Sequence, residues 1–285
     1  MHIFFMCEIY IMLSLSANLS SGYTGLLSFA NAAFYGLGAY VTALCLKKLS
    51  LTFFPSLLIA ILFNMVASSI ITFLSMKLKE LYFTLATLSF QVIVFSILYN
   101  WENVTGGSYG ITAIPSATIL GYSFTTTASY TFLAAIFLLA IFSFFLFFRR
   151  RPFFDLLECI RDTELGVVSL GKNVFTARLV CNAISCSFMA VAGALFAVYN
   201  SYIDATSFTL NESILIISMI LIGGMGNIKG PVLGACFYVM LPEIIRLMPI
   251  DSYKGACLQT IIYSITLIFI VRIKPNGIWG KFKFN

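Results

Sequence analysis

The chain has 285 residues, of which 60% are hydrophobic and only 10% charged, with a formal net charge of +6. Its mean hydropathy is +0.98. A soluble domain of this length needs a charged surface that such a composition does not provide. The composition therefore excludes a soluble domain and predicts an all-α polytopic membrane protein, with residues 1–285 forming a single transmembrane domain.

Membrane-spanning helices need about 20 mainly apolar residues to cross ~30 Å of hydrocarbon. Nine such runs lie between polar breaks, at residues 3–19, 26–46, 53–75, 81–99, 130–148, 179–199, 213–226, 230–245 and 257–271. The seventh and eighth runs are short and adjoin a glycine-rich segment. They could therefore form two separate spans or one broken or re-entrant pair. We expect eight or nine spans. The first run lacks a basic flank and a cleavage site, which favours a retained span over a signal peptide.

Basic residues predict the orientation, because cytoplasmic loops retain Lys and Arg. Threading nine spans with Arg149–Arg151 inside puts 13 basic residues on the cytoplasmic side and four outside. The inside set is Lys77, Lys79, Arg149, Arg150, Arg151, Arg161, Lys172, Arg178, Lys229, Arg272, Lys274, Lys281 and Lys283, and the outside set is Lys47, Lys48, Arg246 and Lys254. The pattern predicts an inner-membrane protein with its N-terminus outside and its C-terminus in the cytoplasm. Because the charges are dispersed over loop ends, no nucleic acid is expected as a partner.

The residues that carry chemistry are scarce. The seven cysteines form no Cys-x-x-Cys pair and His2 is the single histidine, so neither a disulfide frame nor a metal site is predicted. No catalytic constellation and no phosphate-binding loop is visible, so we expect no enzyme and no cofactor bound by this chain. Glu8 and Glu243 are the acidic residues within or near predicted spans, which argues against an ion-coupled carrier.

Two glycine-rich interruptions could expose backbone groups to a polar solute, at 103–110 and 223–230. Tight turns are the alternative reading of both. With two asparagines in or beside spans, the translocation-pathway candidates are Asn18, Asn31, Thr105, Gly106, Gly107, Gly110, Gly223, Gly224 and Gly226. Small residues four apart, such as Ala190 and Ala194, predict close helix packing and do not identify what passes through.

One sustained polar segment, residues 149–178, interrupts the apolar sequence. Phe153, Leu157 and Ile160 form an apolar stripe at helical spacing, and Glu158 and Arg161 stand three apart on the other face. Gly166 and Gly171 are expected to end this helix and turn the chain. The pattern predicts a cytoplasmic docking surface for a soluble partner, with an amphipathic helix resting on the inner leaflet as the alternative.

The order Glu158-x-x-Arg161-Asp162-x-Glu164-x-Gly166-x-x-Ser169-Leu170-Gly171 resembles the cytoplasmic coupling loop of ABC importer permeases. Further blocks resemble the branched-chain amino acid permease family of the LivM type. They begin at Asn18, Phe34, Thr105, Gly193, Gly223 and Lys274, in the family's order. Two features depart from the family: the chain begins after a customary first apolar segment, and Ala30-Asn31 replaces a frequent Gly-His.

The resemblance implies a subunit of a binding-protein-dependent importer. The implied partners are a second permease subunit of the LivH type, two cytoplasmic ATPase subunits that use ATP, a solute-binding protein outside, and membrane lipid. It also implies that Glu158, Arg161, Asp162, Glu164, Gly166, Ser169 and Gly171 couple ATPase closure to the spans. Leucine, isoleucine or valine is the implied solute, with other amino acids, urea and short amides open. An ion-coupled carrier or passive channel is the alternative function.

Overall fold

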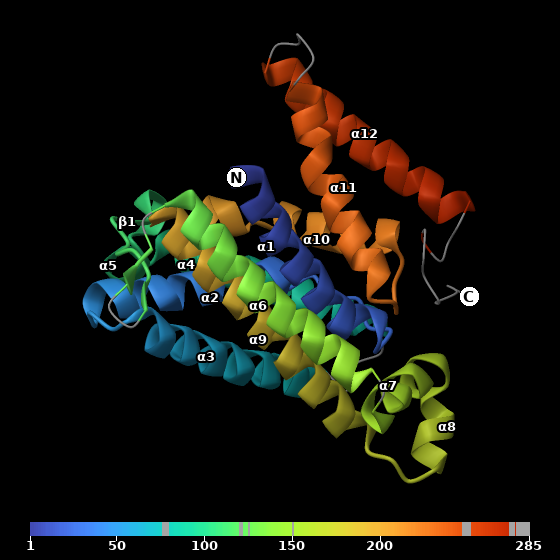
Figure 1. Cartoon of the computed structure of the whole chain (residues 1–285). Helices are drawn as coiled ribbons and strands as arrows, with labels where there is room; N and C mark the ends of the chain where they lie inside the picture. Colours follow the sequence, from blue (N-terminus) through green and yellow to red (C-terminus); the bar gives the residue numbers. More distant parts are fainter. Residues whose placement is uncertain are drawn as a thin grey trace.

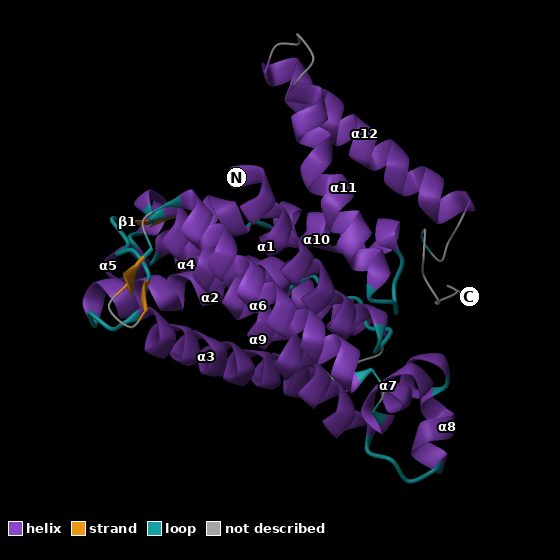
Figure 2. Cartoon of the chain, viewed as in Figure 1, coloured by secondary structure: helices purple, strands orange, loops and turns teal. Residues whose placement is uncertain are grey.

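The computed structural model describes residues 1–75, 80–119, 122–124, 126–149, 151–246, 252–273 and 277. Nine long helices make up most of it: α1 His2–Ala17, α2 Asn31–Lys48, α3 Phe53–Ser75, α4 Glu80–Asn100, α6 Thr127–Phe148, α9 Val174–Asn200, α10 Leu210–Gly223, α11 Lys229–Arg246 and α12 Ser252–Ile273. Each coincides with one of the nine predicted apolar runs. The prediction of an all-α helical bundle is therefore confirmed (Figure 2).

Short elements connect these helices. They are the π-helix η1 Asn18–Gly22, helices α5 Glu102–Thr105, α7 Pro152–Asp162 and α8 Glu164–Ser169, and the 3-10 helices η2 Gly107–Tyr109 and η3 Ala205–Phe208. Two antiparallel ladders pair β1 Ile111–Thr112 with β4 Tyr202–Ile203 and β2 Thr118–Ile119 with β3 Tyr122–Ser123. The seventh and eighth runs form two separate helices joined by a turn.

Five described helices are long and apolar enough to cross a membrane: His2–Gly22, Phe53–Ser75, Tyr82–Asn100, Thr127–Phe148 and Val174–Asn200. The apolar helices Leu210–Gly223 and Leu258–Ile270 are shorter. Helix α2 belongs to neither set, because its small and polar residues lower its hydropathy. Most of its residues are buried, chiefly against α3 and α9. A helix enclosed by other helices does not need lipid-facing side chains.

Close backbone contact joins α2 to α9 at the centre of the bundle. A Cβ atom on Gly38 would lie 2.5 Å from the Cα of Ala190, and one on Gly193 would lie 2.2 Å from the carbonyl oxygen of Tyr35. Only glycine allows such an approach, and helix packing in lipid depends on it. The tight packing predicted from the small residues is confirmed. Around this pair, α1 packs against α6, α9, α10 and α11.

The connecting segments gather at two ends of the bundle (Figure 1). We call one the α5 end, formed by residues 101–119, 122–124, 126 and 201–209, and the other the α7 end, formed by residues 20–30, 149, 151–173 and 224–228. The amines of Lys47 and Lys48 bind the carbonyls of Thr112 and Asn103 at the α5 end. Described basic residues at or beside the α7 end are Arg149, Arg151, Arg161, Lys172, Arg178 and Lys229. Of the residues counted for orientation, Lys77, Lys79, Arg150, Lys274, Lys281 and Lys283 lie outside the described residues, as do the side chains of Arg246 and Lys254.

Candidate functional site

Helix α7 is amphipathic and docks on the bundle. Pro152 occupies its first turn, where a missing N–H costs nothing, and Asp155 complements the helix dipole there. The buried stripe consists of Phe154, Leu157 and Ile160. Phe154, and not the predicted Phe153, begins this stripe, and its ring lies 4.9 Å edge-on from that of Tyr23. Since protein covers the apolar face of α7, this face is not free to rest on the inner leaflet.

Arg161, in the last turn of α7, reaches back into the membrane bundle. Its side chain is only 6% exposed. Its Nε donates to Asp162 Oδ1 at 2.9 Å, and its Nη1 donates to the carbonyl of Gly22 at 3.2 Å. The sequence predicted that Arg161 pairs with Glu158, whereas its Nε is bound by the carboxylate of Asp162.

Glycines make room for this arginine. A Cβ atom on Gly25 would lie 2.9 Å from Arg161 Cγ, and one on Gly226 would lie 2.7 Å from Nη1. Gly25 and Gly226 also have positive φ angles of 78° and 73°. The guanidinium therefore passes between the turn after η1 and the turn between α10 and α11. We call this cluster the Arg161 junction, formed by Asn18, Gly22, Gly25, Arg161, Asp162 and Gly226.

Asn18 ties the two turns together inside the junction. The residue is fully buried, its Nδ2 donates to the Asn227 carbonyl at 2.9 Å, and its Oδ1 accepts from the Gly226 N–H at 3.0 Å. Asn18 begins the π-helix η1, an irregularity frequent at functional sites. The structure thus brings together Arg161 and Asp162, predicted for coupling, and Asn18 and Gly226, predicted for the pathway.

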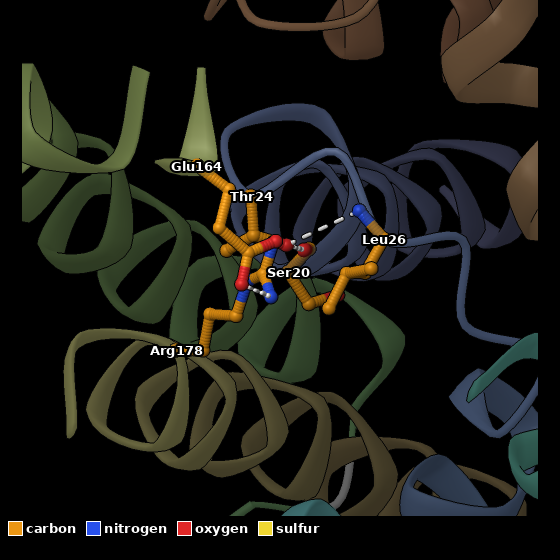
Figure 3. Close-up of polar contacts among 5 residues, drawn as sticks. All are labelled: Ser20, Thr24, Leu26, Glu164 and Arg178. Atoms are coloured by element: carbon orange, nitrogen blue, oxygen red, sulfur yellow. Dashed lines mark hydrogen bonds and ion pairs between the residues drawn. The ribbon is translucent and has the colours of Figure 1, made fainter. Parts of the chain in front are cut away.

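A second ion pair fixes α8 to the bundle. Arg178, near the start of α9, donates from Nη1 and Nη2 to both carboxylate oxygens of Glu164, at 3.1 and 3.0 Å. Figure 3 shows this fork beside Ser20, Thr24 and Leu26. Arg178 is buried while Glu164 is half exposed. A two-pronged pair of this geometry is more directional than a single contact.

The turn residues of this segment differ from the prediction. Gly166 does not end a helix: α7 stops at Asp162, Thr163 breaks the chain with φ −151° and ψ 82°, and Gly166 lies inside α8. The prediction that Gly166 ends this helix is wrong, because the non-helical backbone of Thr163 already ends it. Gly171 does turn the chain, with φ 73°. Ser169 donates to the Leu165 carbonyl at 2.8 Å, a bond within α8.

The first glycine-rich interruption lies at the opposite, α5 end. Thr105 is buried, and its hydroxyl lies within hydrogen-bond distance of the carbonyls of Leu98 and Trp101, at 2.8 and 2.7 Å, and shares its one hydrogen between them. A Cβ atom on Gly106 would lie 2.1 Å from the Gly110 carbonyl, and one on Gly110 would lie 2.1 Å from the Ile203 carbonyl. Gly107 is buried with φ 58°. These four candidates form a compact turn against β4.

The remaining pathway candidates lie near the α7 end. Asn31, the first residue of α2, is buried and donates from Nδ2 to the Ser28 carbonyl at 3.0 Å. A Cβ atom on Gly223 would lie 1.9 Å from the Gly230 carbonyl, and Gly224 has a φ of 109°. The close approach of Gly223 to Gly230 is what lets α11 begin directly against the end of α10.

Sequence reasoning missed two polar residues in the bundle. Glu212 lies one residue before the predicted seventh span, but the first turn of α10 already contains it, and its Oε1 accepts a 2.8 Å bond from the Tyr10 hydroxyl. Gln91 is fully buried near the middle of α4. Its position inside an apolar run was the signal available. Among the described residues, no group of three or more His, Cys, Asp or Glu side chains could hold a metal ion.

Comparison with known proteins decides the family. The family model described as "Branched-chain amino acid transport system / permease component" matches residues 1–271. The chain belongs to this family. It is 32% identical over 262 residues to the high-affinity branched-chain amino acid transport system permease protein LivM of Escherichia coli K12, and 31% identical over 265 residues to its counterpart in Salmonella typhimurium LT2.

Coverage of these relatives is uneven. The two alignments include 84% and 85% of this chain but only 61% and 62% of the relatives' own lengths. A probable LivM protein of Methanocaldococcus jannaschii is 26% identical, covering 95% of this chain and 90% of the relative. No solved structure matches the chain significantly. The family and the apolar helices make this a multi-pass membrane protein of a transport system, and its relatives are transport components and not enzymes.

Proposed function

We propose that this chain is the membrane-spanning permease subunit of a binding-protein-dependent ABC importer for branched-chain amino acids. The Arg161 junction carries the proposal. A helix outside the spans is joined to the bundle through one buried guanidinium, which donates to the Gly22 carbonyl after α1 and packs against Gly226 in the α10–α11 turn. A rigid element of this kind can pass a displacement to several spans at once, which energetic coupling between distant sites requires.

The surface of α8 suits a soluble partner. Leu165, Val168 and Leu170 are 84%, 55% and 79% exposed, outside the long apolar helices. An exposed apolar cluster followed in the chain by the exposed Lys172 is typical of a protein-binding surface. We propose that an ATPase subunit covers this surface. Two such subunits bind and use ATP at their own sites, and this chain binds no cofactor. A LivH-type second permease and an external solute-binding protein complete the proposed importer.

The proposed orientation puts the α7 end in the cytoplasm of a cell with an inner membrane, with the N-terminus outside and the C-terminus inside. Cys159 is an exposed cysteine on α7 and serves as a native reporter. A membrane-impermeant thiol reagent is expected to react with a Ser108→Cys variant in intact cells. It is expected to reach Cys159 and a Lys172→Cys variant only after permeabilisation; the reverse pattern would overturn the orientation.

Affinity purification from native membranes, followed by reconstitution, tests the function. We expect two ATPase subunits and a second permease to copurify, and we expect leucine uptake into proteoliposomes that requires ATP and the binding protein. A chain that purifies alone, or uptake that persists without ATP, would contradict the proposal.

An ion-coupled carrier is the second candidate, and the acidic residues of the bundle favour it. Glu212 is bound by Tyr10, and Glu8 has a buried Oε2 with no hydrogen-bond partner among the described residues. Intramembrane carboxylates are costly and are often functional. A carrier would take up solute under an imposed proton or sodium gradient without any ATPase, so the same proteoliposomes distinguish the two functions.

A further inference from the structure

Two cysteine side chains meet between α1 and α11. The Sγ atoms of Cys7 and Cys236 lie 3.6 Å apart, although the two residues are 229 apart in the chain. Both are partly buried free thiols, and in this form one thiol donates a weak hydrogen bond to the other. The sequence gives no sign of the pair, because each cysteine lies in a separate apolar run and outside any Cys-x-x-Cys motif.

Contacts on the same side of α1 hold the two helices in register. Ser14 donates to the Pro231 carbonyl at 3.1 Å, and Asn18, just after α1, accepts from the Gly226 N–H at 3.0 Å. Later residues of α1 thus meet earlier residues of α11, so the two helices run antiparallel side by side (Figure 1). The thiols therefore face each other within a packed interface, and their approach does not depend on a loose segment.

The other described cysteines are arranged differently. Cys181 donates to the Leu19 carbonyl at 3.2 Å, Cys45 and Cys186 are buried in α2 and α9, and Cys159 is exposed on α7. No other sulfur–sulfur hydrogen bond occurs among the cysteines that the structure describes. The α1–α11 pair is therefore a specific juxtaposition and does not follow from a general abundance of cysteine.

The separation is short enough for oxidation. A disulfide bond is about 2.05 Å long, so the two sulfur atoms need to approach by roughly 1.5 Å. We propose that Cys7 and Cys236 form a reversible disulfide that locks α11 against α1. The oxidant is another disulfide, such as oxidised glutathione. One cysteine thiolate attacks it and displaces a thiol, and the second thiolate attacks the mixed disulfide and displaces another thiol. The two electrons and the two cysteine protons end on the two released thiols.

The place of the pair suits both the chemistry and a lock. Cys7 is in the second turn of α1, and His2, at the start of this helix, bonds to the Tyr199 hydroxyl near the α5 end. In the proposed orientation this end is outside, where disulfides persist. Helix α11 begins directly after the turn that contains Gly226, so a covalent link at Cys236 restrains the helix that leads away from the Arg161 junction. The lock rests on the function proposed above, whereas the bond itself does not.

Peptide mapping of the full chain tests the bond. The protein, purified in detergent with any subunits that accompany it, is treated with oxidised glutathione, alkylated and digested without reduction. We expect a peptide pair joined through Cys7 and Cys236, lighter than the separate peptides by two hydrogen masses and released by dithiothreitol. The exposed Cys159 reports in the same sample that the oxidant reacts, because it forms a mixed disulfide with glutathione. Unlinked Cys7 and Cys236 beside a modified Cys159 would overturn the proposal.

Two serine variants check the assignment. Cys236→Ser should abolish the linked peptide, whereas Cys181→Ser, which removes a buried thiol of α9, should leave it intact. A linked Cys7 in Cys236→Ser protein would contradict the assigned pair. If Cys236→Ser fails to fold, the linked peptide of the parent protein and its release by dithiothreitol still decide.

Transport shows whether the bond is a lock. In proteoliposomes of the complete importer, the oxidised parent protein should lose most of its ATP-dependent leucine uptake and regain it with dithiothreitol. Cys236→Ser protein should transport equally after either treatment, which controls for oxidation of the partner subunits. Unchanged uptake by protein that mass spectrometry shows to be linked would overturn the lock. A reduced parent complex without ATP-dependent uptake would instead refute the proposed function, and the peptide map would still test the bond.

Discussion

The two glycine-rich turns have similar sequences and different surroundings. At the α5 end, a Cβ atom on Gly106 or Gly110 would meet the backbone carbonyl of Gly110 or Ile203, so these two glycines pack against main chain. At the α7 end, Gly226 packs against the guanidinium of Arg161, which belongs to a helix outside the spans. The C-terminal Gly277 also contacts this second turn, since a Cβ on it would lie 2.4 Å from the Gly224 Cα.

The difference teaches that a glycine run by itself does not indicate what a turn does. Both runs permit positive φ angles and close approach. The two turns differ in the long-range contact that their glycines make. Gly110 meets the Ile203 carbonyl, which is main chain, whereas Gly226 meets the Arg161 side chain and so depends on the position of α7. We therefore expect substitutions at the α5 end to affect stability and those at the Arg161 junction to affect transport.

The largest expected effect on stability is that of Gly110→Ala. Gly110 has φ 68° and ψ −165°, a region almost restricted to glycine, and the new Cβ would lie 2.1 Å from the Ile203 carbonyl. We expect a loss of about 3 kcal/mol or more, measured from thermal unfolding in detergent. Gly171→Ala is the control: its φ is 73° but nothing lies within 4 Å of the new Cβ, so only the ~1–2 kcal/mol conformational cost applies. Equal losses would mean that the close approach to Ile203 is unimportant.

Arg161→Ala is expected to act on transport instead. Loss of a hydrogen bond from a charged donor, ~1.5–3 kcal/mol, corresponds to roughly a 10- to 100-fold fall in ATP-dependent uptake if the junction transmits ATPase closure. Arg161→Lys keeps the charge but lacks the fork that reaches both Asp162 and Gly22, so its uptake should be intermediate. Arg272→Ala, an exposed cation of α12 outside the proposed ATPase surface, is the control. Normal uptake by Arg161→Ala in fully assembled complexes would remove the transmission role.

Sequence reasoning worked well where the signal was local. Long apolar runs predicted all nine long helices, because length and hydropathy are properties of one segment. The pairing of Asn18 with Gly226 joins residues 208 apart, and no periodicity encodes such a contact. Gln91 was passed over for the opposite reason: a single amide in an apolar run does not alter hydropathy, although its bonds connect α4 with α2, α10 and η3. Gly166 was misassigned as the end of the helix because glycine is the stronger turn signal, whereas the weaker preference of the β-branched Thr163 for non-helical backbone decides where α7 ends.

Removing the negative partner of the Arg178 fork is expected to cost less than either change above. Glu164→Gln keeps the shape of the side chain and leaves Arg178 without its counter-charge. Because Glu164 is 48% exposed, solvent screens the pair, and we expect a loss of about 1 kcal/mol in the free energy of unfolding. Glu243→Gln, at a partly exposed carboxylate of α11 that makes none of the described ion pairs, is the control. If the loss at Glu164 equals that of Glu243→Gln, the fork contributes no measurable stability.

Ser169→Ala is expected to have the smallest effect. The family resemblance placed Ser169 among the coupling residues with Arg161, but its hydroxyl bonds only to the Leu165 carbonyl in its own helix among the contacts described. Replacing a surface hydroxyl of this kind changes stability by less than about 0.5 kcal/mol, and uptake should equal that of the parent. A large loss of uptake would mean that Ser169 touches an ATPase directly, because the one bond described for its hydroxyl stays within α8. The substitution therefore separates residues that act through the fold from those that act through a partner.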